Sequence, residues 1–207
     1  MKKGYILAIL FFGSLWGLSE VVLGGLLYRF DIPYSSVYLT VIGFGILTVA
    51  RVYLPGRGVA SSIAALAMLY KFMNMPFFAC HLLGILLLGV CYDLFFNFAK
   101  LKNLAVCAVA ATYAGYILFA LMMVYVFRYN HWVEAGLPKV LNHVGIGGTL
   151  AALGCAVVVP LSHRFGKWLQ TTNKTHTYLS DSFIVRARLA LVTAGMWLFA
   201  LVMFVVQ

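Results

Sequence analysis

The sequence predicts an all-α polytopic membrane protein, a bundle of about seven transmembrane helices. Of its 207 residues, 64% are hydrophobic and only 10% are charged, whereas a soluble domain carries about 25% charged residues. The apolar residues form continuous runs of about 20 residues, the length that an α-helix needs to cross a bilayer. A transmembrane barrel would instead show short segments of alternating hydrophobicity. Because a water-soluble core could not bury this much apolar surface, soluble classes are excluded.

Seven apolar segments follow one another along the chain. The third is shorter than an ordinary span. The first follows two lysines, like a signal peptide, but its apolar stretch is too long and no small-x-small cleavage site follows, so we expect an uncleaved first span. The segments are Gly4–Tyr28, Tyr34–Val52, Val59–Phe72, Pro76–Phe98, Leu101–Phe127, Pro138–Ser162 and Ile184–Val206.

These segments divide the chain into a six-helix transmembrane core (1–162), a basic cytoplasmic connection (163–183) and a C-terminal transmembrane helix (184–207). With a cytoplasmic N-terminus, 11 of the 15 basic residues fall inside, as the positive-inside rule requires. We therefore expect the N-terminus inside and the C-terminus outside. The remaining four basic residues fall outside: Arg29, Lys71, Arg128 and Lys139.

A carboxylate lies within the first span. Gly13, Gly17, Glu20 and Gly24 are spaced 4, 3 and 4 residues apart, so they share one stripe of a helix. The two glycines Gly13 and Gly17 form the small-xxx-small pattern of tight helix contacts. An ionisable residue inside a span is a functional hypothesis. Two interpretations stay open: Glu20 hydrogen-bonds a neighbouring helix, or it binds a substrate or a proton.

Further polar groups gather on the predicted outer side. Lys71 and Asn74 flank the turn before the fourth segment, and His81 lies shortly after that segment begins. Each could be merely interfacial, but together with Glu20 they could form one pocket. In it Lys71 would attract an anionic group, and Trp16 or Trp132 would stack on a ring. The candidate substrate-binding residues are Glu20, Lys71, Asn74, His81, Asn142 and His143.

The inner side carries a second carboxylate, Asp93, which shares a helix face with Asn97. Lys100 and Lys102 follow closely and could pair with it, so a structural or partner-docking role is predicted. The cysteines lie in apolar runs without CxxC spacing, which is typical of small packing residues and predicts neither a disulfide nor a zinc framework. They are Cys80, Cys91, Cys107 and Cys155.

Motifs for enzymatic chemistry are not found. The glycine-rich "VGIGGT" at 144–149 lacks the strand of a dinucleotide fingerprint and the lysine of a P-loop, and neither GxSxG nor HExxH occurs. Met73, Met75, Cys80 and His81 are soft metal ligands without a strong motif. The sequence therefore predicts no enzyme, no cofactor, no metal site and no nucleic-acid partner.

The stretch "FFGSLWGLSEVVLGGLLY" at 11–28 resembles small bacterial membrane proteins that are similar to the substrate-binding (S) components of energy-coupling factor (ECF) transporters. The resemblance continues through "LPGRG" at 54–58 and the fourth segment. It implies a protein of usually six helices that binds a vitamin, a related micronutrient or a metal ion from outside. It also implies docking onto a transmembrane coupling protein with two ATPases, and Gly13 and Gly17 stand where that docking pattern would lie.

Two features depart from that family. A seventh segment would be an extra C-terminal helix, and the chain lacks the histidine that follows the initiator Met in metal-specific relatives, which argues against nickel or cobalt. The leading prediction is a small-solute binding subunit of an uptake transporter, in a bacterial inner membrane as the resemblance implies. The main alternative is a membrane anchor of a redox complex that binds haem or quinone through His81 and His143. A third is an assembly factor with no ligand.

Overall fold

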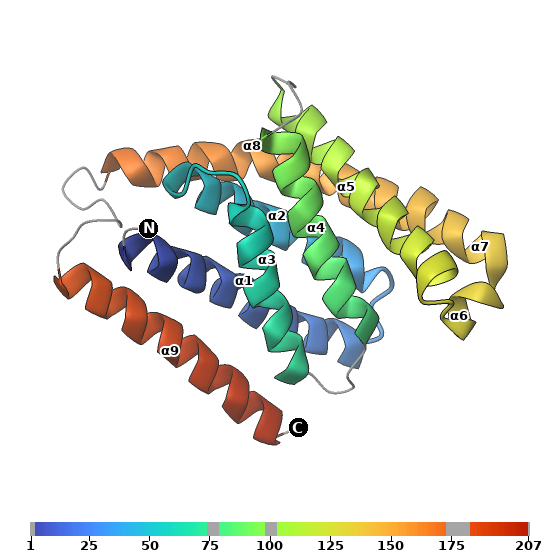
Figure 1. The fold of residues 1–207 in the computed structure, drawn as a ribbon, viewed down its shortest axis with the longest axis horizontal. Helices are drawn as coiled ribbons and strands as arrows, with labels where there is room; N and C mark the ends of the chain where they lie inside the picture. The colour runs from blue at the N-terminus through green and yellow to red at the C-terminus, as the bar shows by residue number, and fades with distance from the viewer. Residues whose placement is uncertain (1–2, 74–78, 98–102, 173–182, 207) are drawn as a thin grey trace.

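The computed structural model describes residues 3–73, 79–97, 103–172 and 183–206, and over these ranges the chain is all-α with no strand. Each of the seven predicted apolar segments contains helix over its described residues (Figure 1). Within the described ranges six helical stretches are long and apolar enough to cross a membrane, and the remaining predicted segment, the third, is the shorter stretch Val59–Met73. The elements are α1 (Lys3–Arg29), α2 (Ser35–Tyr53), α3 (Val59–Tyr70), the 3₁₀ turn η1 (Lys71–Met73), α4 (Ala79–Asn97), α5 (Leu104–Leu121), the π-helical η2 (Met122–Val126), α6 (Asn130–Val133), α7 (Gly136–Leu141), the π-helical η3 (Asn142–Gly147), α8 (Gly148–Thr172) and α9 (Phe183–Val206).

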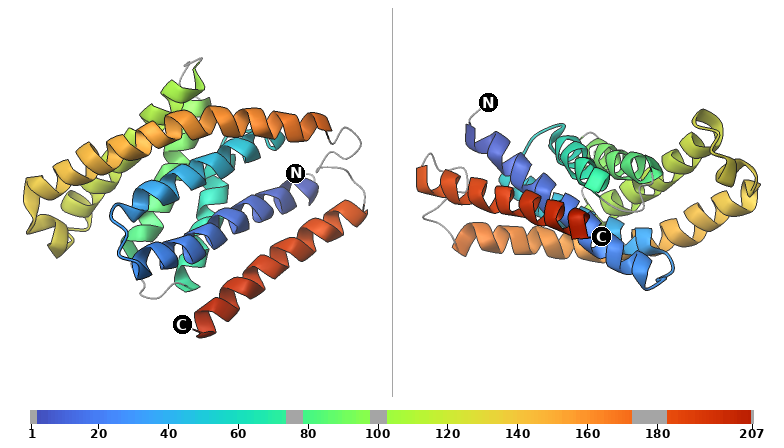
Figure 2. Two further views of the ribbon diagram at one scale, coloured as in Figure 1. Left: turned by 180° about the vertical axis from the view of Figure 1, so that it is seen from behind. Right: turned by 90° about the horizontal axis from the view of Figure 1, so that it is seen from below.

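The short α3 and five of the long helices, all but α9, close into a ring. In order around it, α1 packs on α3, α3 on α4, α4 on α5, α5 on α8, α8 on α2, and α2 again on α1. Helix α9 lies outside this ring, against α1, at the edge of the molecule (Figure 2). Since α9 runs in the same direction as α1, the N- and C-termini lie at opposite ends of these two helices (Figure 1).

Large aromatic side chains opposite small residues fill the centre of the ring. Trp16, Phe44 and Tyr92 are fully or almost fully buried, and Gly43 makes room for Trp16, since a Cβ there would lie 2.6 Å from the indole nitrogen. Small residues that let bulky partners approach are the usual device of membrane helix packing. The Tyr92 hydroxyl lies 3.0 Å from the Thr48 hydroxyl, so the buried phenol is paired.

Helix α3 is too short to cross a bilayer. It starts after Gly58, whose φ of +79° is a conformation that glycine adopts without strain, and its 12 residues span about 18 Å. The hydrocarbon core is about 30 Å thick. The helix therefore ends part-way through the bundle, and η1 turns Lys71, predicted on the outer side, into the protein interior, where it is buried.

Helix α8 is longer than predicted. The sixth segment was expected to end at Ser162, but the helix continues to Thr172, so the first part of the predicted connection 163–183 is helical. The reason is continued packing on α2, because a Cβ at Gly166 would lie 3.1 Å from a methyl group of Val52. Residues 173–182 of the connection lie outside the described residues.

Candidate functional site

A cavity of about 150 Å³ lies between the helices of the ring. Its walls come from the C-terminal half of α1, the start of α2, η1, the first half of α4, the second half of α5, and η3. Four of the six residues predicted for the site line it, namely Glu20, Lys71, His81 and His143. They come from four different elements, so the fold brings together groups that are far apart in the sequence.

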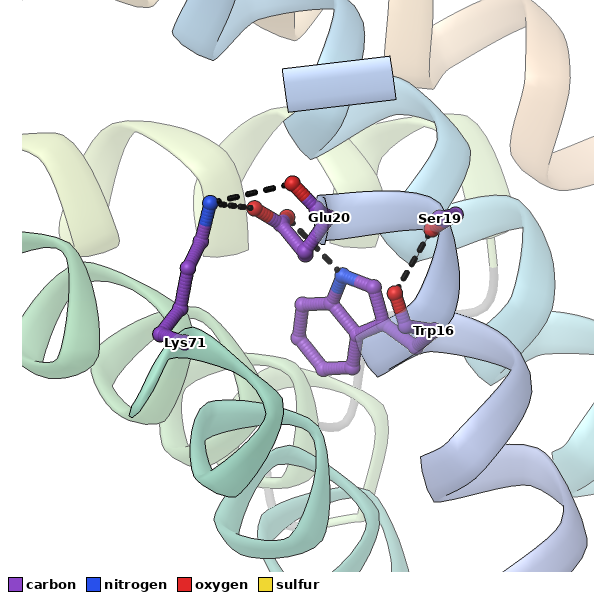
Figure 3. Close-up of polar contacts among 4 residues, drawn as sticks. All are labelled: Trp16, Ser19, Glu20 and Lys71. Carbon is purple, nitrogen blue, oxygen red and sulfur yellow. Dashed lines mark hydrogen bonds and ion pairs between the residues drawn. The ribbon is translucent and has the colours of Figure 1, made fainter. Parts of the chain in front are cut away.

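The charged centre of the cavity is a buried ion pair. Lys71 Nζ lies 3.2 Å from Glu20 Oε2, and the two side chains are only 4% and 6% exposed. The same ammonium group donates to the backbone carbonyl of Glu20 at 3.1 Å, as Figure 3 shows. Removing one partner of such a buried pair destabilises a protein by about 3–5 kcal/mol, because the other charge is left uncompensated.

The glycine stripe of α1 positions this pair. Gly17 lies directly on the Tyr70 side chain, since a Cβ there would be 2.6 Å from Tyr70 Cγ, and this close contact brings the end of α3 against α1. Gly24 leaves space for the ammonium group, which would lie 3.3 Å from a Cβ at that position. The 4-3-4 spacing therefore places the whole stripe against α3 and η1, with Glu20 at the point where Lys71 arrives.

Trp16 hydrogen-bonds the Glu20 carboxylate from within the core. Its indole nitrogen donates to Glu20 Oε1 at 3.2 Å, one helical turn away, and its side chain is 0% exposed (Figure 3). The ring is therefore packed in the core and does not line the cavity. The stacking role predicted for Trp16 is not what the structure shows; instead, Trp16 orients Glu20.

His143 lies in an aromatic cluster that forms another wall of the cavity. Its ring stacks on Tyr116 with centroids 4.8 Å apart, and it contacts Phe119 at 5.2 Å and Trp132 at 5.1 Å. Tyr116 and Phe119 line the cavity with it, whereas Trp132 packs behind the histidine. The histidine belongs to the π-helical η3, and π-helical turns occur frequently at functional sites.

The remaining predicted residues have different places. His81 lies at the exposed edge of the cavity. Asn142 is exposed and accepts a hydrogen bond from the Tyr34 hydroxyl at 3.3 Å, and it does not line the cavity. Asn74 lies outside the described residues.

Thr40, Tyr116 and Phe119 were missed by sequence reasoning. The Thr40 and Tyr116 hydroxyls lie 3.4 Å apart, although 76 positions separate them in the chain, and both residues line the cavity. No local pattern signals such a pair, because a tyrosine in an apolar run is equally typical of a core or an interface position. Only the packing of α2 and of α5 against α8 brings them to one site.

Gly13 and Gly17, predicted to dock a partner protein, contact helix α3 of the same chain. A Cβ at Gly13 would lie 2.7 Å from Leu66 Cβ, and both glycines are buried. On a neighbouring side α1 is covered by α9, where the Trp197 indole donates to the Ser14 hydroxyl at 3.1 Å. The two glycines therefore have an intramolecular role that the sequence pattern did not reveal.

Asp93 is a structural residue at the other end of α3. Its Oδ2 accepts from the Ser61 amide at 2.8 Å and from the Ser61 hydroxyl at 2.7 Å, and its Oδ1 accepts from the Asn97 amide at 2.9 Å. Arg51 in turn donates to the Asn97 side-chain oxygen at 2.7 Å. The carboxylate thus accepts a hydrogen bond from a backbone N–H of the first turn of α3, which has no partner within the helix. The predicted partners Lys100 and Lys102 lie outside the described residues.

The described residues offer no ready metal centre. Among them, no group of three or more His, Cys, Asp and Glu side chains is placed to hold an ion. The four cysteines are free thiols, three of them buried. The cavity is therefore best described by its ion pair, its hydroxyls and its aromatic wall.

Comparisons with protein-family models, with curated proteins and with solved structures give no match to this chain. Composition and structure show a multi-pass helical membrane protein, and the part of the chain that the structure describes contains six helices long and apolar enough to span a bilayer.

Proposed function

We propose that this protein is the membrane-embedded, small-solute binding subunit of an uptake transporter, similar to an ECF S component. In this proposal a separate coupling protein with ATPases supplies the energy, and the solute is a vitamin, a related micronutrient or a metal ion. The observation that carries the proposal is the cavity that gathers Glu20, Lys71, His81 and His143 from four elements. Ligand sites between bundle helices characteristically combine mostly apolar walls with a few convergent polar groups.

The size of the cavity supports a small solute. At about 150 Å³ it equals an engineered apolar cavity that binds benzene, so it accommodates one ring or a fragment of that size. The exposed Tyr28 and His81 side chains at its edge give the solute a route of entry that does not require the ring of helices to open.

The charge distribution supports entry from outside. At the end of the bundle where α1 starts, α8 ends and α9 starts (Figure 1), the latter two helices carry Arg164, Lys167, Arg186 and Arg188. By the positive-inside rule this end faces the cytoplasm. The cavity adjoins the second half of α1, from Glu20 to Tyr28, and hence belongs to the outer half of the bundle in this orientation.

In this proposal the coupling protein does not bind through the glycine stripe of α1. Because α3 covers Gly13 and Gly17, a partner that used them would have to displace α3. In this proposal the partner contacts another surface of the cytoplasmic end.

The alternative, a haem- or quinone-binding anchor of a redox complex, has one observation in its favour: both His81 and His143 line the same cavity. Against haem, the His143 ring is already packed among three aromatic rings, and a macrocycle could reach it only if they moved. A visible spectrum of the purified protein separates the two functions. A Soret band that disappears in His81→Ala or His143→Ala would contradict the transporter proposal.

A matched pair of glycine variants tests the proposed site. Gly25 lines the cavity, and a Cβ there meets no heavy atom of the described residues within 4 Å. Gly25→Phe should therefore fill the cavity without disturbing the fold. Gly195 on α9 is equally open and lies away from the cavity, so Gly195→Phe is the control.

The purified protein is screened for thermal stabilisation by a library of vitamins, their precursors and metal ions. A ligand present at about 100 times its Kd stabilises the folded state by about 2.7 kcal/mol. The proposal expects a hit that stabilises the wild type and Gly195→Phe but not Gly25→Phe. A library without such a hit would contradict it.

A further inference from the structure

We infer that the cavity selects solutes that carry no net charge. This inference rests on the proposed function, since it concerns the solute of that same site. Its basis is the arrangement of the charges that line the cavity: the described lining residues include one carboxylate, Glu20, and one ammonium group, Lys71, and the two are paired at 3.2 Å. With both lining histidines in the neutral form, these charges cancel.

A charged solute would have to compete with this pair. An anionic group that took Lys71 would leave Glu20 buried without its counter-ion, and a cationic group that took Glu20 would do the same to Lys71. Because both side chains are almost completely buried, few water molecules could take the place of the lost partner. A buried charge deprived of its partner is strongly unfavourable, and this penalty would be subtracted from the affinity of any charged solute.

An uncharged solute can bind while the pair stays intact. Lys71 Nζ has three N–H donors, and among the described residues two of them are used, on the backbone carbonyl and on Oε2 of Glu20. From the described residues each oxygen of Glu20 accepts one contact, from Trp16 or from Lys71, and a carboxylate oxygen can accept more than one. One donor and additional acceptor positions therefore remain for a solute.

A primary amide matches this pattern, because it offers a carbonyl acceptor to Lys71 and an N–H donor to Glu20. An attached ring would meet the aromatic wall, where Tyr116, Phe119 and His143 line the cavity. The inferred class is therefore a small planar ring with an uncharged group that both donates and accepts hydrogen bonds.

Three probes of nearly the same shape test the inference: benzamide, benzoate and benzamidinium, with charges of 0, −1 and +1. Their affinities for the purified protein are measured by calorimetry at pH 7. On the wild type, benzamide should bind about tenfold or more tightly than either ion, since a buried charge without its partner weakens binding by at least one factor of ten. Glu20→Gln should reverse the preference toward benzoate, and Lys71→Met toward benzamidinium.

Two kinds of result would overturn the inference. One is a wild-type preference for benzoate or benzamidinium, or binding of none of the three probes. The other is an unchanged preference in folded Glu20→Gln and Lys71→Met proteins. If either single variant fails to fold because its remaining charge is buried, the wild-type comparison decides the question alone.

The Gly25→Phe variant distinguishes failure of the charge-selection inference from failure of the proposed function. A charged probe that binds best to the wild type and is lost in Gly25→Phe overturns the charge selection while leaving the cavity as a solute site. If no solute of the wider library depends on Gly25, the proposed function itself fails.

Discussion

The contact between Gly17 and Tyr70 gives the sharpest prediction about the fold. A Cβ on residue 17 would lie 2.6 Å from Tyr70 Cγ and 2.9 Å from Tyr70 Cβ, whereas ordinary contacts measure 3.4–4 Å. Tyr70 cannot easily yield, because it is fully buried and its ring lies 4.2 Å from that of Trp197. Gly17→Ala should therefore force α1 and α3 apart.

The magnitude follows from two opposing effects. Overpacking a well-filled core costs about 1–3 kcal/mol, and replacing a helical glycine by alanine returns up to about 1 kcal/mol. We expect Gly17→Ala to lower the free energy of unfolding by about 1–2 kcal/mol, and Gly195→Ala, which meets no neighbouring atom, to leave it unchanged or raise it.

The assay is reversible unfolding in mixed micelles, followed by circular dichroism, on the wild type and the two alanine variants. A Gly17→Ala protein as stable as Gly195→Ala would refute the close contact. A folded, fully stable Gly17→Ala protein that loses a copurifying partner would return the glycine stripe to the docking role predicted from sequence.

Three further predictions concern other parts of the chain. Asp93→Ala should lower the free energy of unfolding by about 3 kcal/mol, because the Ser61 amide and hydroxyl lose a charged acceptor. The control Ser62→Ala changes an exposed side chain and should alter the free energy of unfolding by less than about 0.5 kcal/mol. Equal effects of the two substitutions would contradict the capping role of Asp93. Trp197→Ala removes the indole that contacts Tyr70, so hydrogen exchange in α9 should accelerate while the ring helices keep their protection; unchanged exchange in α9 would count against this anchor. A topology reporter fused after Gln207 should report an external C-terminus, and a cytoplasmic signal would refute the proposed orientation.

The helices could be predicted from sequence because each is a long apolar run, and in a bilayer every backbone polar group must be satisfied within the segment. The ends of the helices were harder to predict from the sequence. The end of α8 depends on how Gly166 fits against Val52, a tertiary contact that hydrophobicity does not encode. The burial of Lys71 also depends on a tertiary feature, because the short α3 ends where η1 can bring the ammonium group against Glu20.

Part of the site was predictable for a different reason. Helical periodicity fixes which residues share a face, so the glycine stripe with Glu20 could be recognised, and a carboxylate at membrane depth is in itself a signal. Periodicity does not say which helix covers that face. The glycines consequently suggested a partner protein where the structure has α3, and the aromatic wall of Tyr116 and Phe119 gave no signal at all.

The central claim is that the cavity beside the Glu20–Lys71 pair binds a small solute. Its most direct test is the calorimetric affinity of the best hit of the stability screen for the wild type, Gly25→Phe and Gly195→Phe. The claim predicts saturable binding of one solute per chain to the wild type and to Gly195→Phe, and loss of that binding in Gly25→Phe. Equal affinity for all three proteins would contradict it, because the solute would then bind elsewhere.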